Sequence, residues 1–368
     1  MNADPSTRRW PLARLVSHPS AWRPSDFDGE HDWLRRLTPE QVNQLAAQAE
    51  EWSKALPELG SLRAVAQDLP ALEPLVQDMK RDLSTRGFVL VRGLPVEELG
   101  DHLAGLAFWA LGTLMGTPVT QNARGDLICP VTDMGVRFGY SGAEEEKNVR
   151  GYQSRADLNY HCDSADLVSL LCLRQAKSGG ASTIVSTPTV YNEFVLRHPE
   201  HLGVLERGFP YDRKGEEGPG EAQVSRAIPV FYRHADSVSS RYARSFILGG
   251  AIKQGVPLTP DEIAALDCFD RIAREPDVAL SMSFQPGDMQ WVNNLTVVHG
   301  RTAYEDHPEP GRRRFLHRLW VDMGGESPWS REGEVMRWEF GRYGNLGIPA
   351  TEAGRLVAPA ADRQEEIS

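Results

Sequence analysis

The spacing of hydrophobic residues predicts helices in the first third of the chain. Three helical segments are indicated, over residues 38–56, 73–85 and 96–114. In the first, apolar residues recur at helical spacing, Thr38 stands at the N-cap position and Pro39 at the first helical position. Between the second and third helices, GFVLVRGLP predicts a short buried strand over residues 88–91, closed by turn-forming residues.

After residue 167 the pattern changes to short apolar runs that predict strands. These runs cover residues 167–174, 182–186, 227–232, 279–284, 289–292, 295–298 and 314–321, with one helix over 189–199. Short strands between Gly and Pro turns, in a chain whose helices come early, favour an α+β fold with a double-sheet β-roll core and flanking helices. We expect a helical N-terminal extension over residues 1–86 packing on the core, a core domain over 87–349 and a weakly ordered tail over 350–368.

Composition and charge narrow the classes of function. The chain has 368 residues with 40% hydrophobic content, which is enough for a core without disulfide bonds. A formal net charge of −11 argues against a surface built for nucleic acid or anionic lipid. The longest mostly apolar stretch, residues 103–115, is too short to cross a bilayer, and the cysteine spacing fits neither a metal knuckle nor a disulfide framework. These features predict a cytoplasmic protein without membrane or nucleic-acid partners, and they are compatible with a homo-oligomer.

The stretch NYHCDSAD carries the first candidate chemistry. On a strand, residues i and i+2 face the same side, so His161 and Asp163 would present an imidazole and a carboxylate to one point while Cys162 faces away. That geometry suits metal chelation, although such a tripeptide alone also fits an ordinary pair at a strand end. A third ligand is indicated at His299, which ends the apolar run LTVV and precedes Gly300, where the backbone can turn sharply.

The segment RRRFLHRLWV provides a candidate anion site. Strand alternation puts Arg314, Leu316, Arg318 and Trp320 on one face and Phe315, His317, Leu319 and Val321 on the other. Both faces are partly apolar, so at least one arginine is expected to point inward. A buried guanidinium is costly without an anion, which is either a protein carboxylate or a dicarboxylate cosubstrate.

Two histidines and one carboxylate leave coordination positions open, an arrangement that selects Fe(II) in oxygen-using enzymes. The alternatives are a zinc-dependent hydrolase and a catalytically silent small-molecule-binding protein on the same fold. The sequence contains no HExxH motif and no obvious general base for a hydrolase, and all three candidate ligands are present, which counts against a silent protein. Motifs of serine hydrolases, P-loop proteins and dinucleotide-binding proteins are absent from the sequence.

Four motifs resemble those of the taurine dioxygenase and TfdA-like family, within the clavaminate-synthase-like Fe(II)/2-oxoglutarate oxygenases. They are YHCD, SGGAST, VNNLTVVHGRTAYED and RRRFLHRLW, and the resemblance runs from about Phe88 to Val321. It implies a double-stranded β-helix, or jelly roll, whose Fe(II) is held by His161, Asp163 and His299.

The resemblance also implies where the cosubstrate lies. Arg314 would grip the distal carboxylate of 2-oxoglutarate together with the hydroxyl of Ser182, with Thr183 as the competing choice. Arg312 and Arg313 remain alternatives to Arg314, although alternation with Arg318 favours Arg314.

By the same resemblance, the enzyme would use 2-oxoglutarate and O2, release succinate and CO2, and oxidise a C–H bond of a small metabolite. Hydroxylation is the default outcome, desaturation and cyclisation stay open, and the presence of Asp163 argues against halogenation. Arg318 would reach the substrate or the other end of the cosubstrate, which suggests an anionic or amino-acid-like substrate. Candidate substrate-binding residues are Gln121, Asn159, Tyr160 and Arg318, with Arg155 and a Gly-rich lid over residues 138–142.

Overall fold

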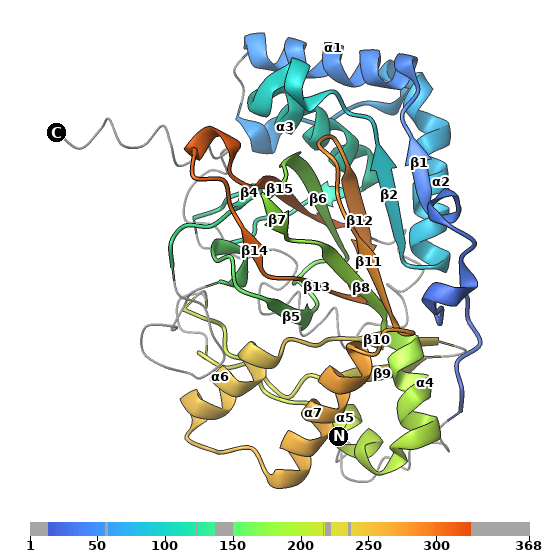
Figure 1. Cartoon of the computed structure of the whole chain (residues 1–368), viewed down its shortest axis with the longest axis vertical. Helices are drawn as coiled ribbons and strands as arrows, with labels where there is room; N and C mark the ends of the chain where they lie inside the picture. The colour runs from blue at the N-terminus through green and yellow to red at the C-terminus, as the bar shows by residue number, and fades with distance from the viewer. Residues whose placement is uncertain are drawn as a thin grey trace, which may run out of the picture.

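Two β-sheets packed face to face form the centre of the molecule (Figure 1). The computed structural model describes residues 14–55, 58–122, 124–136, 150–215, 217, 222–234 and 237–324. The seven-stranded sheet runs in the order β1 (Leu34–Arg36), β2 (Phe88–Arg92), β12 (Met289–Asn293), β6 (Leu167–Arg174), β15 (Phe315–Asp322) and β3 (Thr117–Pro118), with β4 (Ile128–Val131) also paired to β15. The four-stranded sheet runs in the order β11 (Ala279–Met282), β8 (Ser182–Ser186), β13 (Val297–Arg301) and β5 (Leu158–His161).

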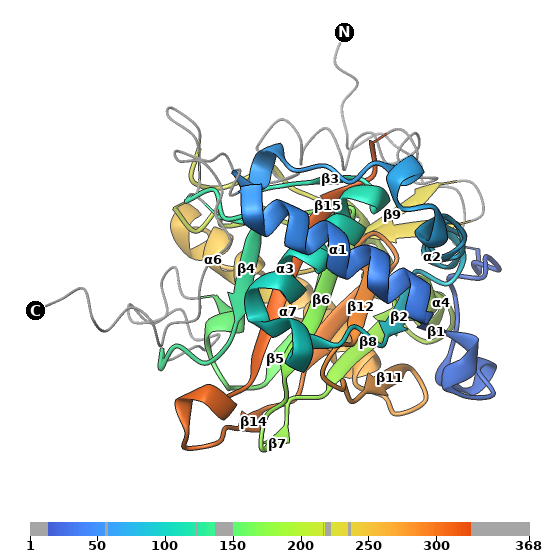
Figure 2. The ribbon, with the colours of Figure 1, turned by 90° about the horizontal axis from the view of Figure 1, so that it is seen from above.

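Helices cover the outer face of each sheet, which gives a four-layer arrangement. The helices against the large sheet are α1 (Pro39–Ala55), α2 (Glu73–Thr85) and α3 (Val96–Met115). Those against the small sheet are α4 (Thr187–Arg197), α5 (Leu202–Arg207), α6 (Arg244–Gln254) and α7 (Pro260–Ala273). Figure 2 shows α1 and α3 lying across the strands of the large sheet. Two small ribbons, β9 (Phe231–His234) with β10 (Ser237–Ser240) and β7 (Ser178–Gly179) with β14 (Tyr304–Glu305), complete the strands.

Alternation along the strands divides the interior into separate cores. In β2, Val89 and Val91 pack in the core beneath α1 to α3, whereas Phe88 and Leu90 pack between the two sheets. Each such side chain contributes roughly 1.5–3 kcal/mol by leaving water. Because every residue of β2 is buried, a shift by one residue would exchange the two cores, and the hydrophobic pattern therefore fixes the register.

Most predicted elements are confirmed. The helix predicted over residues 38–56 is α1, and it begins with a reciprocal pair in which Thr38 N donates to Gln41 Oε1 at 2.9 Å and Gln41 N donates to Thr38 Oγ1 at 3.3 Å. The helix predicted over 73–85 and the strand predicted over 182–186 match α2 and β8. The alternation predicted for RRRFLHRLWV is also confirmed, since Leu316 lies in the core between the sheets and Leu319 beneath α3.

Three predictions about the second half were wrong. The strand predicted over 227–232 begins only at Phe231, since Pro229 before it has no N–H to pair. The strand predicted over 295–298 is displaced to Val297–Arg301, because the Asn293 side chain accepts the N–H of Leu295 at 2.9 Å and holds a turn there. The expectation that helices come early missed α5, α6 and α7.

The N-terminal segment is joined to the core by a strand. Within it, β1 pairs in parallel with β2, and α1 and α2 share the core that includes Trp291 of β12. The division of the chain into an N-terminal extension over residues 1–86 and a core domain over 87–349 stays a prediction. The predicted lid over 138–142 and the tail over 350–368 lie outside the described residues. In the described part of the chain, no helix is both long and apolar enough to cross a membrane.

Replacing the buried His317 by leucine should weaken the dependence of stability on pH. Burial lowers the pKa of His317 to about 4 from its ordinary value of 6.5, so the unfolded chain takes up a proton that the folded chain does not. This difference destabilises the fold by about 2 kcal/mol on going from about pH 7 to about pH 5. His317→Leu should lack that loss, as measured by chemical denaturation at both pH values. An equal loss in both proteins would contradict this account.

Candidate metal centre and its cavity

Two of the three predicted metal ligands are direct neighbours across adjacent strands. His161 of β5 and His299 of β13 are register partners, and their ring centroids lie 4.4 Å apart. The prediction that His299 ends a strand was wrong, since it lies in the middle of β13 with strands on both sides. The ring is therefore anchored by a paired backbone on each side.

Gly300 is required for close strand packing, in place of the sharp turn predicted there. A Cβ atom at this position would lie 2.7 Å from the carbonyl oxygen of Leu158 and 3.4 Å from Cδ1 of Tyr160. The register between β13 and β5 shifts immediately after His299, between His299 and Arg301. The missing side chain thus lets the two ligand-bearing strands approach at the point where their regular pairing ends.

Asp163 lies beyond the end of β5, which corrects the prediction that it shares a strand with His161. Its turn is held by side chains from distant segments. Arg241 Nη1 donates to the carbonyl oxygens of Cys162 and, at 2.9 Å, of Asp163, while Nη2 donates to Ser164 Oγ at 2.9 Å. Asn294 accepts the N–H of Asp163 at 3.2 Å and donates to the carbonyl of the same turn at Ala165 at 2.9 Å.

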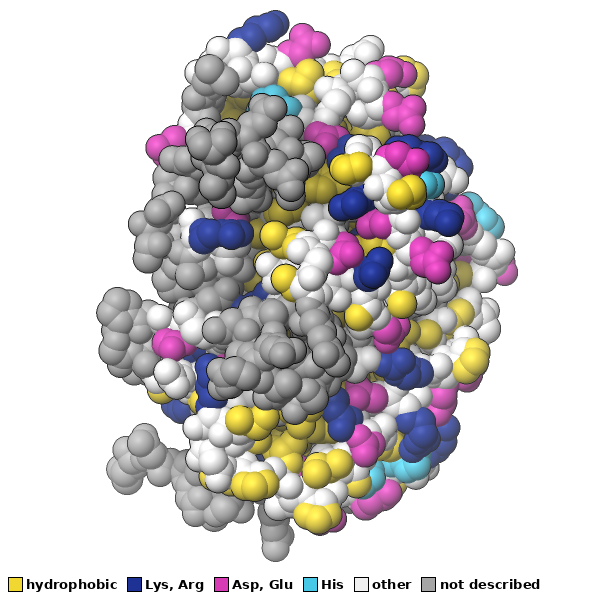
Figure 3. Space-filling view, turned by 60° about the vertical axis from the view of Figure 1, so that its left-hand side comes forward, with side chains coloured by type: hydrophobic (Ala, Val, Ile, Leu, Met, Phe, Trp, Pro, Cys, Tyr) yellow, Lys and Arg dark blue, Asp and Glu magenta, His cyan; other side chains and the backbone are white. Residues whose placement is uncertain are grey.

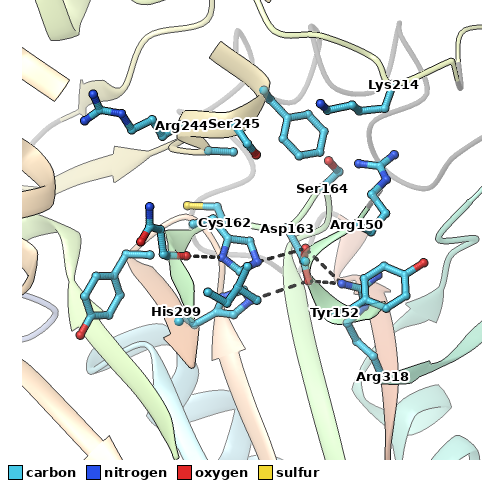
Figure 4. Close-up of a pocket in the computed structure, with 18 of the residues that line it drawn as sticks. Arg150, Tyr152, Cys162, Asp163, Ser164, Lys214, Arg244, Ser245, His299 and Arg318 are labelled. Atoms are coloured by element: carbon cyan, nitrogen blue, oxygen red, sulfur yellow. Dashed lines mark hydrogen bonds and ion pairs between the residues drawn. The ribbon is translucent and has the colours of Figure 1, made fainter. Parts of the chain in front are cut away.

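The three side chains converge on one point (Figure 4). One ligand atom from each of His161, Asp163 and His299 can be chosen so that all lie within 4.8 Å of one another. Asp163 Oδ1 is 3.9 Å from His161 Nε2, and Oδ2 is 3.8 Å from His299 Nε2. The Nδ1 atom of His161 lies 2.9 Å from the carbonyl oxygen of Asn159, which favours the tautomer that leaves Nε2 free to bind a metal.

The protonation states of the three side chains suit a cation. Burial lowers the pKa of His161 and lowers that of His299 to about 3, in each case against the raising effect of Asp163. Burial alone would raise the pKa of Asp163, but the charge of Arg318 and the nearby histidines outweigh it and bring this pKa below its usual range. At neutral pH the set therefore offers two neutral imidazoles and one carboxylate, which suit a divalent transition metal such as Fe(II).

Arg318 and Trp320 support the Asp163 carboxylate from the side away from the histidines. Arg318 Nη1 lies 3.2 Å from Oδ2 of Asp163, and Trp320 Nε1 donates to the same oxygen at 2.9 Å. The guanidinium is held in turn by Gln121, whose Oε1 accepts from Arg318 Nε at 2.8 Å, and it stacks 4.5 Å from the ring of Tyr152. Arg318 and Gln121 both line the cavity. Their contacts orient the Asp163 carboxylate.

Arg314 lies at another part of the same cavity. It is 4% exposed, its guanidinium stacks 5.0 Å from the ring of Tyr304, and its Nη1 atom has no hydrogen-bond partner among the described residues. Burial lowers the pKa of Arg314. The two alternatives, Arg312 and Arg313, are exposed. A buried guanidinium that lacks one partner is a suitable site for an anionic ligand.

Ser182 lines the cavity with Arg314, whereas Thr183 is not among the lining residues. Side chains alternate along β8, so Ser182 shares a face with Ile184 and Thr183 shares a face with Val185. Ile184 belongs to the core between the sheets and Val185 to the core that packs against α4 to α7, so the two hydroxyls lie on opposite faces. The Ser182 hydroxyl is 3.0 Å from Gln290 Oε1, which fixes its position.

The remaining predicted residues are placed as follows. The Asn159 side chain accepts a hydrogen bond from Arg274 at the cavity edge. The Tyr160 ring packs in the core against α4 to α7 and also lines the cavity. Arg155 is largely exposed and lies 3.8 Å from Asp133. Cys162 is packed in the same core as Tyr160, as expected, and burial raises its pKa to about 11.

Sequence reasoning missed the side chains that shape the site from afar. Arg241 and Asn294 hold the turn of Asp163, and Lys214 and Ser245 line the cavity wall across from the metal ligands. Asn294 lies within VNNLTVVHGRTAYED, one of the motifs that carry the family resemblance, but nothing in that motif marks it as a support for Asp163. Around Arg241 the sequence has only SSRYARS, which contains two arginines, Arg241 and Arg244, and no pattern that marks either of them.

Arg241→Met should weaken metal binding without removing a metal ligand. The variant loses the donors that fix the backbone of Cys162 to Ser164, so Asp163 is no longer held in place, and we expect the Kd for Fe(II) to rise by about tenfold or more. The Kd is measured by anaerobic titration with Fe(II) in a calorimeter. Arg92→Met is the control, because it removes a similarly buried guanidinium, paired with Asp288 in the large sheet. Equal Kd values in the two variants would show that Arg241 has no positioning role.

Comparison with known proteins agrees with this geometry. A family model described as taurine catabolism dioxygenase TauD, TfdA family matches residues 53–320. The chain is 31% identical over 331 residues to FR-33289 synthase from Streptomyces rubellomurinus. The match covers 89% of this chain and 96% of that protein.

Solved structures show the same fold at lower identity. Asparagine oxygenase, in complex with Fe(II), 2S,3S-3-hydroxyasparagine and succinate, matches with a TM-score of 0.59 at 18% identity, over 79% of this chain and 94% of that chain. The non-heme iron oxygenase OrfP, in complex with Fe and alpha-ketoglutaric acid, matches with a TM-score of 0.58 at 19% identity, over 79% and 93%. These comparisons do not favour the zinc hydrolase or the silent binding protein. The chain belongs to the TauD, TfdA family of dioxygenases, enzymes that depend on Fe(II) and 2-oxoglutarate.

Proposed function

We propose that this protein hydroxylates a C–H bond of a small metabolite that is anionic or amino-acid-like, with desaturation or cyclisation as the other outcomes of the same chemistry. The observation that carries the proposal is one cavity lined both by the converging ligand atoms of His161, Asp163 and His299 and by the incompletely paired guanidinium of Arg314. The two facing sheets would be the two halves of a jelly roll, with the metal near one end of the small sheet.

The cosubstrate would bind between the metal and Arg314. A carboxylate on Arg314 gives the buried guanidinium a charge-assisted hydrogen bond that it lacks among the described residues, which offsets the cost of its burial. The hydroxyl of Ser182 is the second group we assign to this carboxylate, and its one proton, which is donated to Gln290 Oε1 in the structure, would turn to the ligand. Because 2-oxoglutarate carries its keto acid at the opposite end, that end would face the three metal ligands.

Iron and 2-oxoglutarate, when bound, supply with O2 the oxidising equivalents for C–H cleavage and release succinate and CO2. The chain's own residues provide position and a restricted environment. Arg318 and Trp320 keep the Asp163 carboxylate oriented through Oδ2. Burial keeps the imidazoles neutral, and the aromatic walls at Tyr152 and Trp320 limit the access of water to the reacting atoms.

The function is tested by titrating the anaerobic apoprotein with Fe(II) and 2-oxoglutarate and recording the weak visible charge-transfer band of the chelate. We expect the band in the wild type and its loss in His161→Ala. In Arg314→Met the affinity for 2-oxoglutarate should fall by at least tenfold, since the charge-assisted contact to its distal carboxylate is removed. Arg313→Met, which changes the exposed neighbour, is the matched control. A folded wild-type protein without the band would overturn the proposal.

The assignment of the hydroxyl is tested separately. Ser182→Ala should raise the Kd for 2-oxoglutarate by about tenfold, because it removes a hydrogen bond to a charged group. Thr183→Val, on the other face of β8, should leave this Kd within about twofold. The reverse order of effects in the same anaerobic titration would assign the contact to Thr183 and reject Ser182.

A further inference from the structure

A short segment after β10, residues 241–244, lies along the edge of the strand that carries His161. The small sheet ends at β5, so within that sheet β5 pairs with a strand on one side only, β13. On the other side, Ala243 forms an antiparallel bridge with His161, and the N–H of Cys162 donates to the carbonyl oxygen of Tyr242 at 2.7 Å. This edge segment therefore holds the end of β5 from the side opposite to β13.

The side chains of the edge segment alternate between the cavity and the interior. Arg241 and Ala243 line the cavity, whereas Tyr242 is fully buried in the core that packs against α4 to α7. The Tyr242 ring stacks on Phe269 of α7, with the ring centroids 3.9 Å apart. The edge segment thus connects the cavity wall to α7.

One carboxylate of α7, that of Asp270, holds the edge segment at two points. The Tyr242 hydroxyl donates to Asp270 Oδ1 at 2.6 Å, and Arg244 Nη1 donates to Asp270 Oδ2 at 2.8 Å. Arg244 is also paired with Asp267, one turn earlier on α7, at 2.6 Å. In Figure 4 the guanidinium of Arg244 points away from Asp163. These contacts therefore lie behind the metal ligands and outside the space that a substrate would occupy.

Asp270 differs from the acidic residues of the outer surface. Among the described residues drawn in Figure 3, acidic and basic side chains are interspersed, and exposed pairs of this kind contribute little to any one arrangement. The Asp270 side chain is only 18% exposed, and it does not line the cavity. Both of its donors, Tyr242 and Arg244, belong to the edge segment. A change at Asp270 should therefore act on this segment before it acts on the cavity.

We propose that Asp270 is a positioning residue for the metal centre, which it reaches through Tyr242 and the edge segment. This role rests on the function proposed above, because it assumes that His161 binds the metal. With the edge segment fixed to α7, the backbone of His161 has a partner on each side, and its imidazole stays directed toward Asp163 and His299. A loosened segment would let the end of β5 move and would weaken metal binding without the loss of a ligand.

The test is hydrogen exchange at the backbone amide of Cys162, measured on the protein without metal. Asp270→Asn leaves one acceptor oxygen for two donors, because an amide NH2 group cannot accept, and Tyr242→Phe removes one donor while keeping the ring. In both variants this amide should exchange at least tenfold faster than in the wild type, since its acceptor, the Tyr242 carbonyl, is held less firmly. Anaerobic calorimetry with Fe(II) should then give a Kd raised by at least fivefold in both variants.

Glu275→Gln is the matched control. Glu275 lies just after α7 and accepts from Arg197 of α4 at 2.8 Å and 3.0 Å. The change therefore also removes a charge that anchors this end of α7, but at a place away from the edge segment. The exchange rate of the Cys162 amide and the Kd for Fe(II) should both stay within twofold of the wild type.

The outcomes separate a positioning role from a structural role and from failure of the proposed function. Faster exchange with a higher Kd in Asp270→Asn and Tyr242→Phe alone supports the proposal. Unchanged exchange in these variants, or faster exchange with an unchanged Kd, rejects it and leaves the oxygenase function standing. An equal effect of Glu275→Gln would show general loosening of α7 and would also reject it. A wild-type protein that exchanges slowly at Cys162 but binds no Fe(II) would overturn the proposed function, and with it the role of Asp270 at the metal.

Discussion

The buried carboxylate of Asp163 is the constraint on which the rest of the site depends. A charge of this kind is stable in the interior only with close partners, and here Arg318 and Trp320 supply them on one oxygen. Because Asp163 lies beyond its strand, its backbone also needs support, which Arg241 and Asn294 provide. Residues from both sheets, from the segment after β10 and from the turn after β12 therefore support a single side chain.

The layered fold explains how these partners are brought together. The small sheet contributes the histidines through β5 and β13, and the large sheet contributes Arg318 and Trp320 through β15. Apolar residues between the sheets set their separation, so the polar side chains at the end of that core face one another across the cavity. Helix α6 adds residues to the opposite wall. The catalytic and binding groups therefore belong to different layers held at fixed positions.

Local pattern was sufficient for elements whose partners are nearby and insufficient for those stabilised at long range. The alternation in RRRFLHRLWV predicted that Arg314 and Arg318 share a face, and both side chains line the cavity. The strand end before Asp163 was missed, since the turn is held by Arg241, 78 residues later along the chain. The cavity wall at Lys214 and Ser245 was missed because these residues come from separate segments with no common spacing. The boundary of the strand at His299 was misplaced because an asparagine turn replaces paired backbone just before it.

The register pairing of His161 with His299 makes metal binding a check on folding. Side chains alternate between faces with a period of two, so a one-residue slip of β5 against β13 would send one imidazole to the opposite face of the sheet. A chain with that error would retain most of its hydrogen bonds and much of its apolar burial, yet it would offer a metal only scattered ligands. Iron supplied during synthesis would stabilise correctly paired chains and leave mispaired ones without that stabilisation. His161 and His299 would then favour the correct strand register during folding as well as bind the metal of the folded enzyme.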